Sequence, residues 1–396
     1  MSAVVSEIES DDQRAATRGT LLAAVERVRP ILEAHADEAE RERTLPEPAW
    51  RALHDEGLFV LKAPRELGGH EADPLTQLEV LEAVSRIDTS AGWSLMIGAG
   101  TLALTMPWVS DAGLPALMRA GRLPRTAGAA MPGGSATPVA GGYRVTGRWA
   151  FASGCQHAEW LLGGAVIAGS DPPQLRLMLF PIEDVVLLDT WHVGGLKGTG
   201  SGDFAVTDAF VPEELSIDVL AWRQQRGGPL YRIRSAGLVA MEHGAFAIGA
   251  ARRALEEMRD LARSRRRGFT QQGVADRSVF QFDLGYCEQA LNAARANVVD
   301  AYRRAWTYVL ESEKNTAPPE VEIELRAAAV YATDVAVEIT RRMFRHAGAR
   351  ALYSGNVIER CQRDMQAASQ HYVMNQGTYE LRGQALLGVQ GLISMS

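Results

Sequence analysis

Apolar residues recur every three to four positions in the first part of the chain. One stripe contains Leu21, Val25, Val28 and Leu32, and a second contains Leu78, Leu81, Val84 and Ile87. This spacing places apolar side chains on one face of an α-helix. Pro30 interrupts the first stripe and predicts a kink or a division of that helix. We therefore expect residues 1–121 to form a helical domain.

The hydrophobic period changes to two between about residues 122 and 226. Apolar positions alternate with polar or small ones at Tyr143, Val145, Trp149 and Phe151, and again at Leu175, Leu177 and Leu179. Such alternation is typical of β-strands that bury one face. Glycine is frequent in the same region, which indicates tight turns. This part of the chain is expected to be a β-domain.

Helical spacing returns from about residue 227. One apolar stripe contains Met241, Ala245, Ile248, Leu255, Met258 and Ala262. Three more long helices are expected after it. Pro318 and Pro319 should separate two of them, because proline has no amide donor and disfavours helix just before it. Residues 227–396 are thus expected to form a second helical domain, in an α+β chain that periodicity alone does not assign to one fold.

Composition and charge restrict the classes of function. The 396 residues are 46% hydrophobic and 22% charged, as in a globular protein with a sizeable core. A net charge of −7 argues against an extended nucleic-acid surface. The sequence contains no apolar run of roughly 18 residues, and its first residues do not resemble a signal peptide. We expect a cytoplasmic protein without a membrane partner.

The cysteines give no sign of a disulfide framework or a metal site. Cys155, Cys287 and Cys361 are far apart, and none belongs to a Cys-x-x-Cys pair. Their odd number and wide spacing are typical of buried, reduced thiols. No metal centre is expected.

Four short segments carry more specific information. Residues 129–135 read Ala-Ala-Met-Pro-Gly-Gly-Ser, and residues 147–154 read Gly-Arg-Trp-Ala-Phe-Ala-Ser-Gly. Residues 194–201 read Gly-Gly-Leu-Lys-Gly-Thr-Gly-Ser, and residues 363–371 read Arg-Asp-Met-Gln-Ala-Ala-Ser-Gln-His. In this order and at these separations they resemble segments of the acyl-CoA dehydrogenase superfamily. The resemblance implies that fold: an N-terminal α-helical domain, a central β-barrel-like domain and a C-terminal four-helix bundle.

One substitution points to a branch of that superfamily. Acyl-CoA dehydrogenases most often carry a catalytic glutamate about eight residues beyond the Arg-Asp pair, where this chain has His371, Tyr372 and Val373. Removal of an α-proton needs a carboxylate base. The chain therefore resembles the group D two-component flavin monooxygenases, which include aromatic and indole hydroxylases and dibenzothiophene monooxygenase.

That resemblance implies a reaction and its partners. Reduced FAD, or alternatively FMN, would come from a separate flavin reductase. With O2 it would form a C4a-hydroperoxyflavin that hydroxylates a small aromatic or heteroaromatic compound, phenol-like or indole-like. The same resemblance implies a homotetramer. The sequence does not identify the substrate.

The resemblance also implies roles for particular residues. His371 would face the flavin C4a and the substrate, where an imidazole with a pKa near 6.5 can exchange a proton. Ser153 would hold the flavin N5. The other flavin contacts would come from Phe151, Gly154, Met131, Thr199, Ser201, Arg266 and Phe269, and the substrate contacts from Trp93, Tyr372 and Asn375, of which Asn375 would also orient His371.

Several alternatives remain open. Glu242 could instead be the base of an acyl-CoA dehydrogenase, and nitrogen or sulfur could be oxygenated in place of carbon. The basic run Arg263–Arg267 could be a solvated helix end, or a nucleic-acid contact in a non-enzymatic member, which the acidic charge disfavours. Phenol hydroxylases of the group often carry a histidine shortly after the tryptophan at Trp93. Here that stretch is Gly98, Ala99 and Gly100, which favours an indole-like ring over a phenol.

Overall fold

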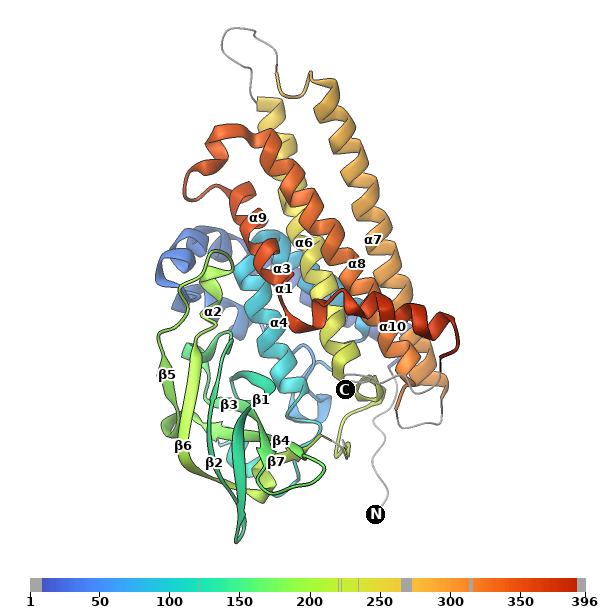
Figure 1. Ribbon diagram of the computed structural model, residues 1–396. Coiled ribbons are helices and arrows are strands. Elements are labelled where there is room, and N and C mark those ends of the chain that lie inside the picture. Colours follow the sequence, from blue (N-terminus) through green and yellow to red (C-terminus); the bar gives the residue numbers. More distant parts are fainter. Residues whose placement is uncertain are drawn as a thin grey trace.

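Helices from both ends of the chain pack together beside one β-sheet (Figure 1). The computed structural model describes residues 9–389, except residues 120, 220, 222, 234, 265–272 and 313–315. The predicted order of helices, strands and helices is confirmed. None of the helices in these described ranges is long and apolar enough to cross a membrane.

The N-terminal part contains four helices of at least two turns and one short helix. They are α1 (Asp11–Glu42), α2 (Glu47–Asp55), α3 (Pro74–Ile87), α4 (Thr89–Ala103) and α5 (Leu114–Leu117). The prediction that Pro30 could divide the first helix is wrong, because α1 is a single helix with Pro30 inside it. Val28 and Leu32 are buried on either side of the proline and keep both turns packed against the core.

Helix α4 runs through the middle of the molecule. Asp88 caps its N-terminus by accepting a hydrogen bond from the Ala91 amide at 2.8 Å. Almost every side chain of α4 is buried, on all sides of the helix. It packs against α3, the start of α6 and strand β1 (Thr126–Val139), so that it can present residues to both the helices and the sheet.

The strands form one seven-stranded mixed sheet in the order β5-β6-β2-β1-β3-β4-β7. The bounds of the remaining strands are β2 (Gly142–Trp149), β3 (Trp160–Ile167), β4 (Leu175–Pro181), β5 (Val186–Leu188), β6 (Asp203–Pro212) and β7 (Ser216–Asp218). Strands β1 and β3 are parallel, and their register shifts between Ala129 and Gly134. This irregularity bends β1 away from regular pairing at one of the segments that carry the family resemblance.

The predicted alternation in β2 holds up to the end of the strand. Tyr143, Val145 and Trp149 are buried as expected, but Phe151 lies beyond the strand and is 72% exposed. Its φ of 66° is in the left-handed region, which a side chain larger than glycine rarely adopts. Phe151 is therefore not part of the core and belongs to the wall of a cavity described below.

In the described residues of the C-terminal part, two further long helices follow α6, not the three that were predicted. The long helices are α6 (Ser235–Ser264), α7 (Ser278–Glu311) and α8 (Pro319–Ala347), and the shorter ones are α9 (Val357–Ala368) and α10 (Gly377–Leu386). The chain breaks at Gly348 and again around His371, where a 3-10 turn (Tyr372–Met374) replaces continuous helix. The predicted stripe from Met241 to Ala262 is buried, and α6 packs against α3, α4, α7, α8 and α9.

Candidate active site

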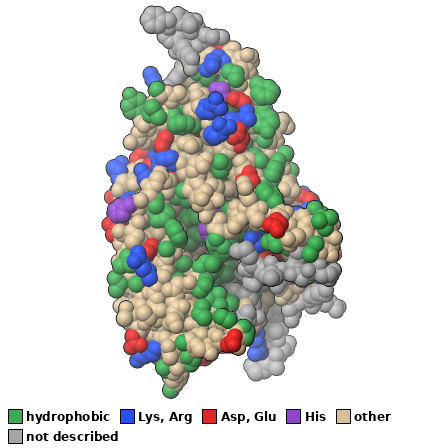
Figure 2. Space-filling model, in the orientation of Figure 1, with side chains coloured by type: hydrophobic (Ala, Val, Ile, Leu, Met, Phe, Trp, Pro, Cys, Tyr) green, Lys and Arg blue, Asp and Glu red, His purple; other side chains and the backbone are tan. Residues whose placement is uncertain are grey.

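A cavity of about 580 Å³ lies where α4, the start of α6, the sheet and the chain after α9 meet. Figure 2 shows a hollow on this face of the molecule, with hydrophobic side chains gathered around it. Strand β1 contributes residues 128–132 to the lining, and the segment at the end of β2 contributes residues 148–151. Most of the lining is apolar, which is typical of sites that bind small aromatic molecules or cofactors.

A chain of hydroxyl groups forms the polar part of the sheet-side wall. Trp93 Nε1 donates to Ser153 Oγ at 3.1 Å, Ser153 Oγ lies 2.6 Å from Ser201 Oγ, and Ser201 Oγ lies 2.6 Å from Thr199 Oγ1. Thr199 Oγ1 in turn donates to the Leu196 carbonyl at 2.8 Å. The two ends of this chain fix its direction, because an indole nitrogen can only donate and a carbonyl can only accept.

The direction of this series of hydrogen bonds determines whether the Ser153 hydroxyl can donate to a ligand or accept from it. Since Thr199 uses its proton on the Leu196 carbonyl, Ser201 must donate to Thr199, and Ser153 must donate to Ser201. Each hydroxyl oxygen can accept two hydrogen bonds. Ser153 accepts one from Trp93 and therefore keeps one lone pair. Ser153 lines the cavity, so it can accept a hydrogen bond from a ligand there but cannot donate one without breaking the chain.

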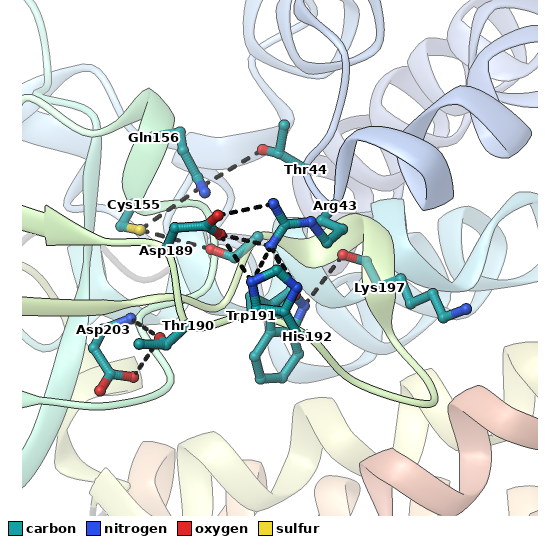
Figure 3. A network of polar contacts seen from close by, with 11 residues as sticks. Arg43, Thr44, Cys155, Gln156, Asp189, Thr190, Trp191, His192, Lys197 and Asp203 are labelled. Carbon is teal, nitrogen blue, oxygen red and sulfur yellow. Dashed lines mark hydrogen bonds and ion pairs between the residues drawn. The ribbon is translucent and has the colours of Figure 1, made fainter.

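The loop that carries Ser201 and Leu196 is fixed by contacts with the N-terminal helices (Figure 3). Arg43 pairs with Asp189, with 3.1 Å between Nη2 and Oδ2, and it donates to the Trp191 carbonyl at 3.4 Å. Trp191 Nε1 lies 3.1 Å from the carbonyl oxygens of both Leu196 and Lys197. The Trp191 ring, which lines the cavity, meets the Phe151 ring edge to face at 6.3 Å. The loop is thus held in place before any ligand binds.

His371 also lines the cavity, at the start of the 3-10 turn. Its Nδ1 accepts a long hydrogen bond of 3.4 Å from the Val373 amide, which favours the tautomer with the proton on Nε2. Burial and the neighbouring His243 ring lower the pKa of His371 well below its usual value. At neutral pH the ring, which lines the cavity, is therefore uncharged and keeps one N–H donor.

A second histidine, His243 on α6, packs against His371 with the two ring planes tilted by 39°. The two ring centroids lie 4.2 Å apart, and the Trp93 ring meets both histidines edge to face. His243 Nδ1 lies 2.9 Å from the Val239 carbonyl, so Nδ1 carries the proton. Burial lowers the pKa of His243 to about 4. Its Nε2 is buried and accepts no hydrogen bond from any residue in the described part of the chain.

An ion pair lies beside these rings. The Lys62 ammonium is 2.9 Å from Glu242 Oε1, and the two side chains are 1% and 2% exposed. Burial raises the pKa of Glu242, and the charge of Lys62 opposes this effect. Glu242 lines the cavity, as the dehydrogenase alternative required, but its carboxylate is already paired.

The structure brings most of the predicted site residues to this cavity. Those that line it are Trp93, Met131, Phe151, Ser153, Ser201, His371 and Tyr372. Gly154 and Thr199 line a smaller adjacent cavity that shares Ser153. The positions of Arg266 and Phe269 lie outside the described residues.

Asn375 is the predicted residue that the structure places elsewhere. Its side chain is exposed, and its Oδ1 accepts a hydrogen bond from the Gly377 amide at 2.7 Å. It is absent from the described residues that line the cavity. The 3-10 turn after His371 turns the chain away from the cavity before Asn375 is reached. A continuous helix would have kept Asn375 one turn from His371.

Two residues of the site, Lys62 and His243, were not predicted. His243 lies within the apolar stripe of α6, and Lys62 lies in the apolar sequence Leu58-Phe59-Val60-Leu61-Lys62. A single charged or titratable residue in an apolar run could have indicated such a site residue, because a buried group of this kind needs a partner.

Comparisons with known proteins agree with the fold. Residues 11–116 match the N-terminal domain of acyl-CoA dehydrogenase, and residues 241–376 match its C-terminal domain. The chain is 31% identical to indole-3-acetate monooxygenase of Pseudomonas putida over 91% of each chain. It is 28% identical to the flavin-dependent monooxygenase oxygenase subunit HsaA of Rhodococcus jostii, over 86% of this chain and 91% of that protein.

Solved structures show the same similarity. XiaF from Streptomyces, in complex with FADH2 and glycerol, superposes with a TM-score of 0.89 at 25% identity, over 96% of this chain and 98% of that one. The dibenzothiophene monooxygenase TdsC from Paenibacillus, with FMN and indole, superposes with a TM-score of 0.80 at 21% identity, over 95% and 98% of the two chains. At that identity the second likeness concerns the fold alone.

Proposed function

This chain belongs to the acyl-CoA dehydrogenase family, among its flavin-dependent monooxygenases, and from that premise we propose that it is the oxygenase component of a two-component system. It takes reduced flavin from a separate flavin reductase and uses O2 to hydroxylate a small aromatic or heteroaromatic compound. The monooxygenases that it resembles support this proposal over a dehydrogenase that uses Glu242.

The residues around the cavity fit a reduced flavin. Phe151 and Met131 are 72% and 53% exposed, so two large apolar side chains beside the cavity are available to cover a planar ring. Ser153 offers one free lone pair, which suits the protonated N5 of a reduced flavin and not the bare N5 of an oxidised one. We propose FAD as the flavin, with FMN as the alternative, since the similar XiaF was solved with FADH2.

Bound reduced flavin supplies the two electrons with which one oxygen atom of O2 enters the substrate while the other leaves as water. The protein provides the surroundings for that chemistry. The apolar walls exclude water, and the fixed loop at Trp191 and Leu196 holds the site in shape. His371 stays neutral and presents its Nε2 proton to an oxygen atom in the cavity.

The observation that carries the proposal is the neutral imidazole of His371 facing an apolar cavity. Tyr372 follows it where the dehydrogenases most often have their glutamate. A phenol cannot accept an α-proton as a carboxylate does. A neutral imidazole can donate a hydrogen bond during oxygen transfer, and this position of the chain has no carboxylate that could act as the base of a dehydrogenase.

Binding of reduced flavin and incorporation of oxygen test the proposal together. We expect saturable anaerobic binding of FADH2, or of FMNH2, followed after O2 is added by incorporation of one atom from ¹⁸O2 into indole, indole-3-acetate or phenol. Reduction of tightly bound oxidised flavin by an acyl-CoA thioester, without binding of reduced flavin, would instead establish a dehydrogenase.

A further inference from the structure

We propose that the Glu242 carboxylate is the substrate-recognition group of this cavity and that it selects aromatic rings that carry an N–H. The inference rests on the proposed function, because it assigns the substrate class of the same site. It concerns the part of the cavity between α4 and α6, where Gly100 and Glu242 face each other.

The position of Glu242 is the first step. Val239 and Glu242 lie one turn apart on α6 and both line the cavity. Across from them α4 has Gly100, and a Cβ at that position would lie 3.4 Å from Glu242 Oε2. Oε2 therefore faces the place where α4 has no side chain. The carboxylate thus lies beside Gly100, which belongs to the stretch after Trp93 where the sequence has only Gly98, Ala99 and Gly100.

The second step is that the carboxylate has room for another donor. Lys62 pairs with Oε1, and among the described residues Glu242 makes no other ion pair and no side-chain hydrogen bond to a further residue. A buried carboxylate is stabilised by several donors and is costly with few. A ligand N–H would supply a donor that the protein itself leaves out.

The third step is that the facing wall offers no competing polar group. Met96, Ile97 and Leu104 are apolar. The Thr101 hydroxyl is used within the protein, at 3.0 Å from the Gly98 carbonyl and 2.8 Å from Thr126 Oγ1. A polar group of the substrate on this side therefore meets the carboxylate.

The net charge of the Lys62–Glu242 ion pair restricts the class of substrate further. Lys62 and Glu242 together are neutral, so they offer no net attraction to an anion or a cation. A neutral ring N–H binds the free oxygen without disturbing the pair. A ring with oxygen in that place would bury the carboxylate against a second acceptor, and such mismatches are discriminated strongly in buried sites.

Indole and benzofuran are the probes for a test, because they have nearly the same shape and differ in the N–H. Isothermal titration calorimetry of the full chain with reduced flavin, under anaerobic conditions, measures binding without turnover. We expect wild type to bind indole at least about tenfold more tightly than benzofuran. The double variant Lys62→Met/Glu242→Leu, which removes both charges, should bind the two rings within about twofold.

Two further variants keep the test decisive. Glu242→Gln retains the shape of the side chain and should lower the preference to about threefold, even if the double variant does not fold. Asp283→Asn breaks a partly buried ion pair with Arg342 on α7 and α8, away from the cavity, and should keep the wild-type preference. Unfolding temperatures check that each variant is folded.

The outcomes separate this inference from the proposed function. Equal binding of the two rings by wild type, an unchanged preference in the Glu242 variants, or no binding of either ring overturns the role of Glu242. Binding of reduced flavin and its oxidation by O2, measured without any ring compound, decide the proposed function independently.

Discussion

The two polar walls of the cavity are built in opposite ways. On the sheet side, every hydroxyl proton from Ser153 to Thr199 is used within the protein, and each hydroxyl oxygen keeps one lone pair. On the α6 side, the Nε2 of His243 has no partner among the described residues, and Glu242 has only Lys62. The first wall suits the reduced flavin, which is the same compound whichever substrate is bound. The second leaves groups to be completed by a ligand.

The largest effect on product formation is expected from substitution of His371. His371→Ala removes the N–H that the cavity offers to an oxygen atom, and loss of such a group typically lowers a rate about a hundredfold to ten-thousandfold. We expect product formation to fall at least about a hundredfold, while bound reduced flavin is still oxidised and releases H2O2. Product and peroxide are measured in the same reaction.

A surface histidine serves as the comparison for that variant. His35 on α1 pairs with Glu38 away from the cavity, so His35→Ala should keep the wild-type ratio of product to peroxide. Wild-type product yield in the His371→Ala protein would show that the imidazole does not take part.

The buried His243 on the α6 side should also affect how the free energy of unfolding depends on pH. His243 has a pKa of about 4 when folded and about 6.5 when unfolded, so folding favours its neutral form. Its contribution is complete above pH 6.5 and is lost as the pH falls toward 4, because the unfolded chain then binds more protons. The full loss corresponds to roughly 3 kcal/mol.

His243→Leu removes that contribution while the site stays filled by an apolar side chain. Urea unfolding at pH 7, 6 and 5 should therefore show a smaller fall in the free energy of unfolding for the variant than for wild type. The difference between the two proteins removes the contribution of other groups such as Asp364, whose pKa burial raises to about 7. It leaves the contribution of His243 together with that of His371, whose pKa the His243 ring lowers. Parallel pH curves would contradict the assignment.

The satisfied wall should respond to the loss of one hydroxyl. Ser153→Ala leaves the buried Trp93 N–H without its acceptor, which costs about 1–3 kcal/mol of the free energy of unfolding. It also removes the lone pair proposed for the reduced flavin, and we expect about a tenfold lower yield of product per flavin oxidised.

Ser94 offers a matched control on the same helix as Trp93. Its hydroxyl is buried but has no hydrogen-bond partner in the described ranges of the chain, so Ser94→Ala removes an equal group without breaking a bond. We expect it to be neutral or slightly stabilising. If Ser94→Ala and Ser153→Ala lower stability and product yield equally, the directed chain of hydroxyls has no special role.

The sequence predicted the two walls unequally. Phe151, Ser153 and His371 belong to short motifs that carry the family resemblance, and the structure places all three at the cavity. Lys62 and Glu242 are far apart in sequence, and their pairing depends on how α6 packs beside the N-terminal helices. Periodicity predicts which face of a helix is buried, but it does not predict which buried groups meet across two elements.

The smallest effect is expected at Asn375, where motif reasoning and structure differ. Asn375 was expected to orient His371, but its Oδ1 accepts from the Gly377 amide at the start of α10, on the exposed side of the 3-10 turn. Asn375→Ala should lower the free energy of unfolding by about 1 kcal/mol, as the loss of a single hydrogen bond does, and should change product yield by less than about twofold. A loss comparable to that of His371→Ala, at unchanged stability, would show that Asn375 reaches the cavity during the reaction. It would also mean that the turn after His371 changes its conformation when ligand binds.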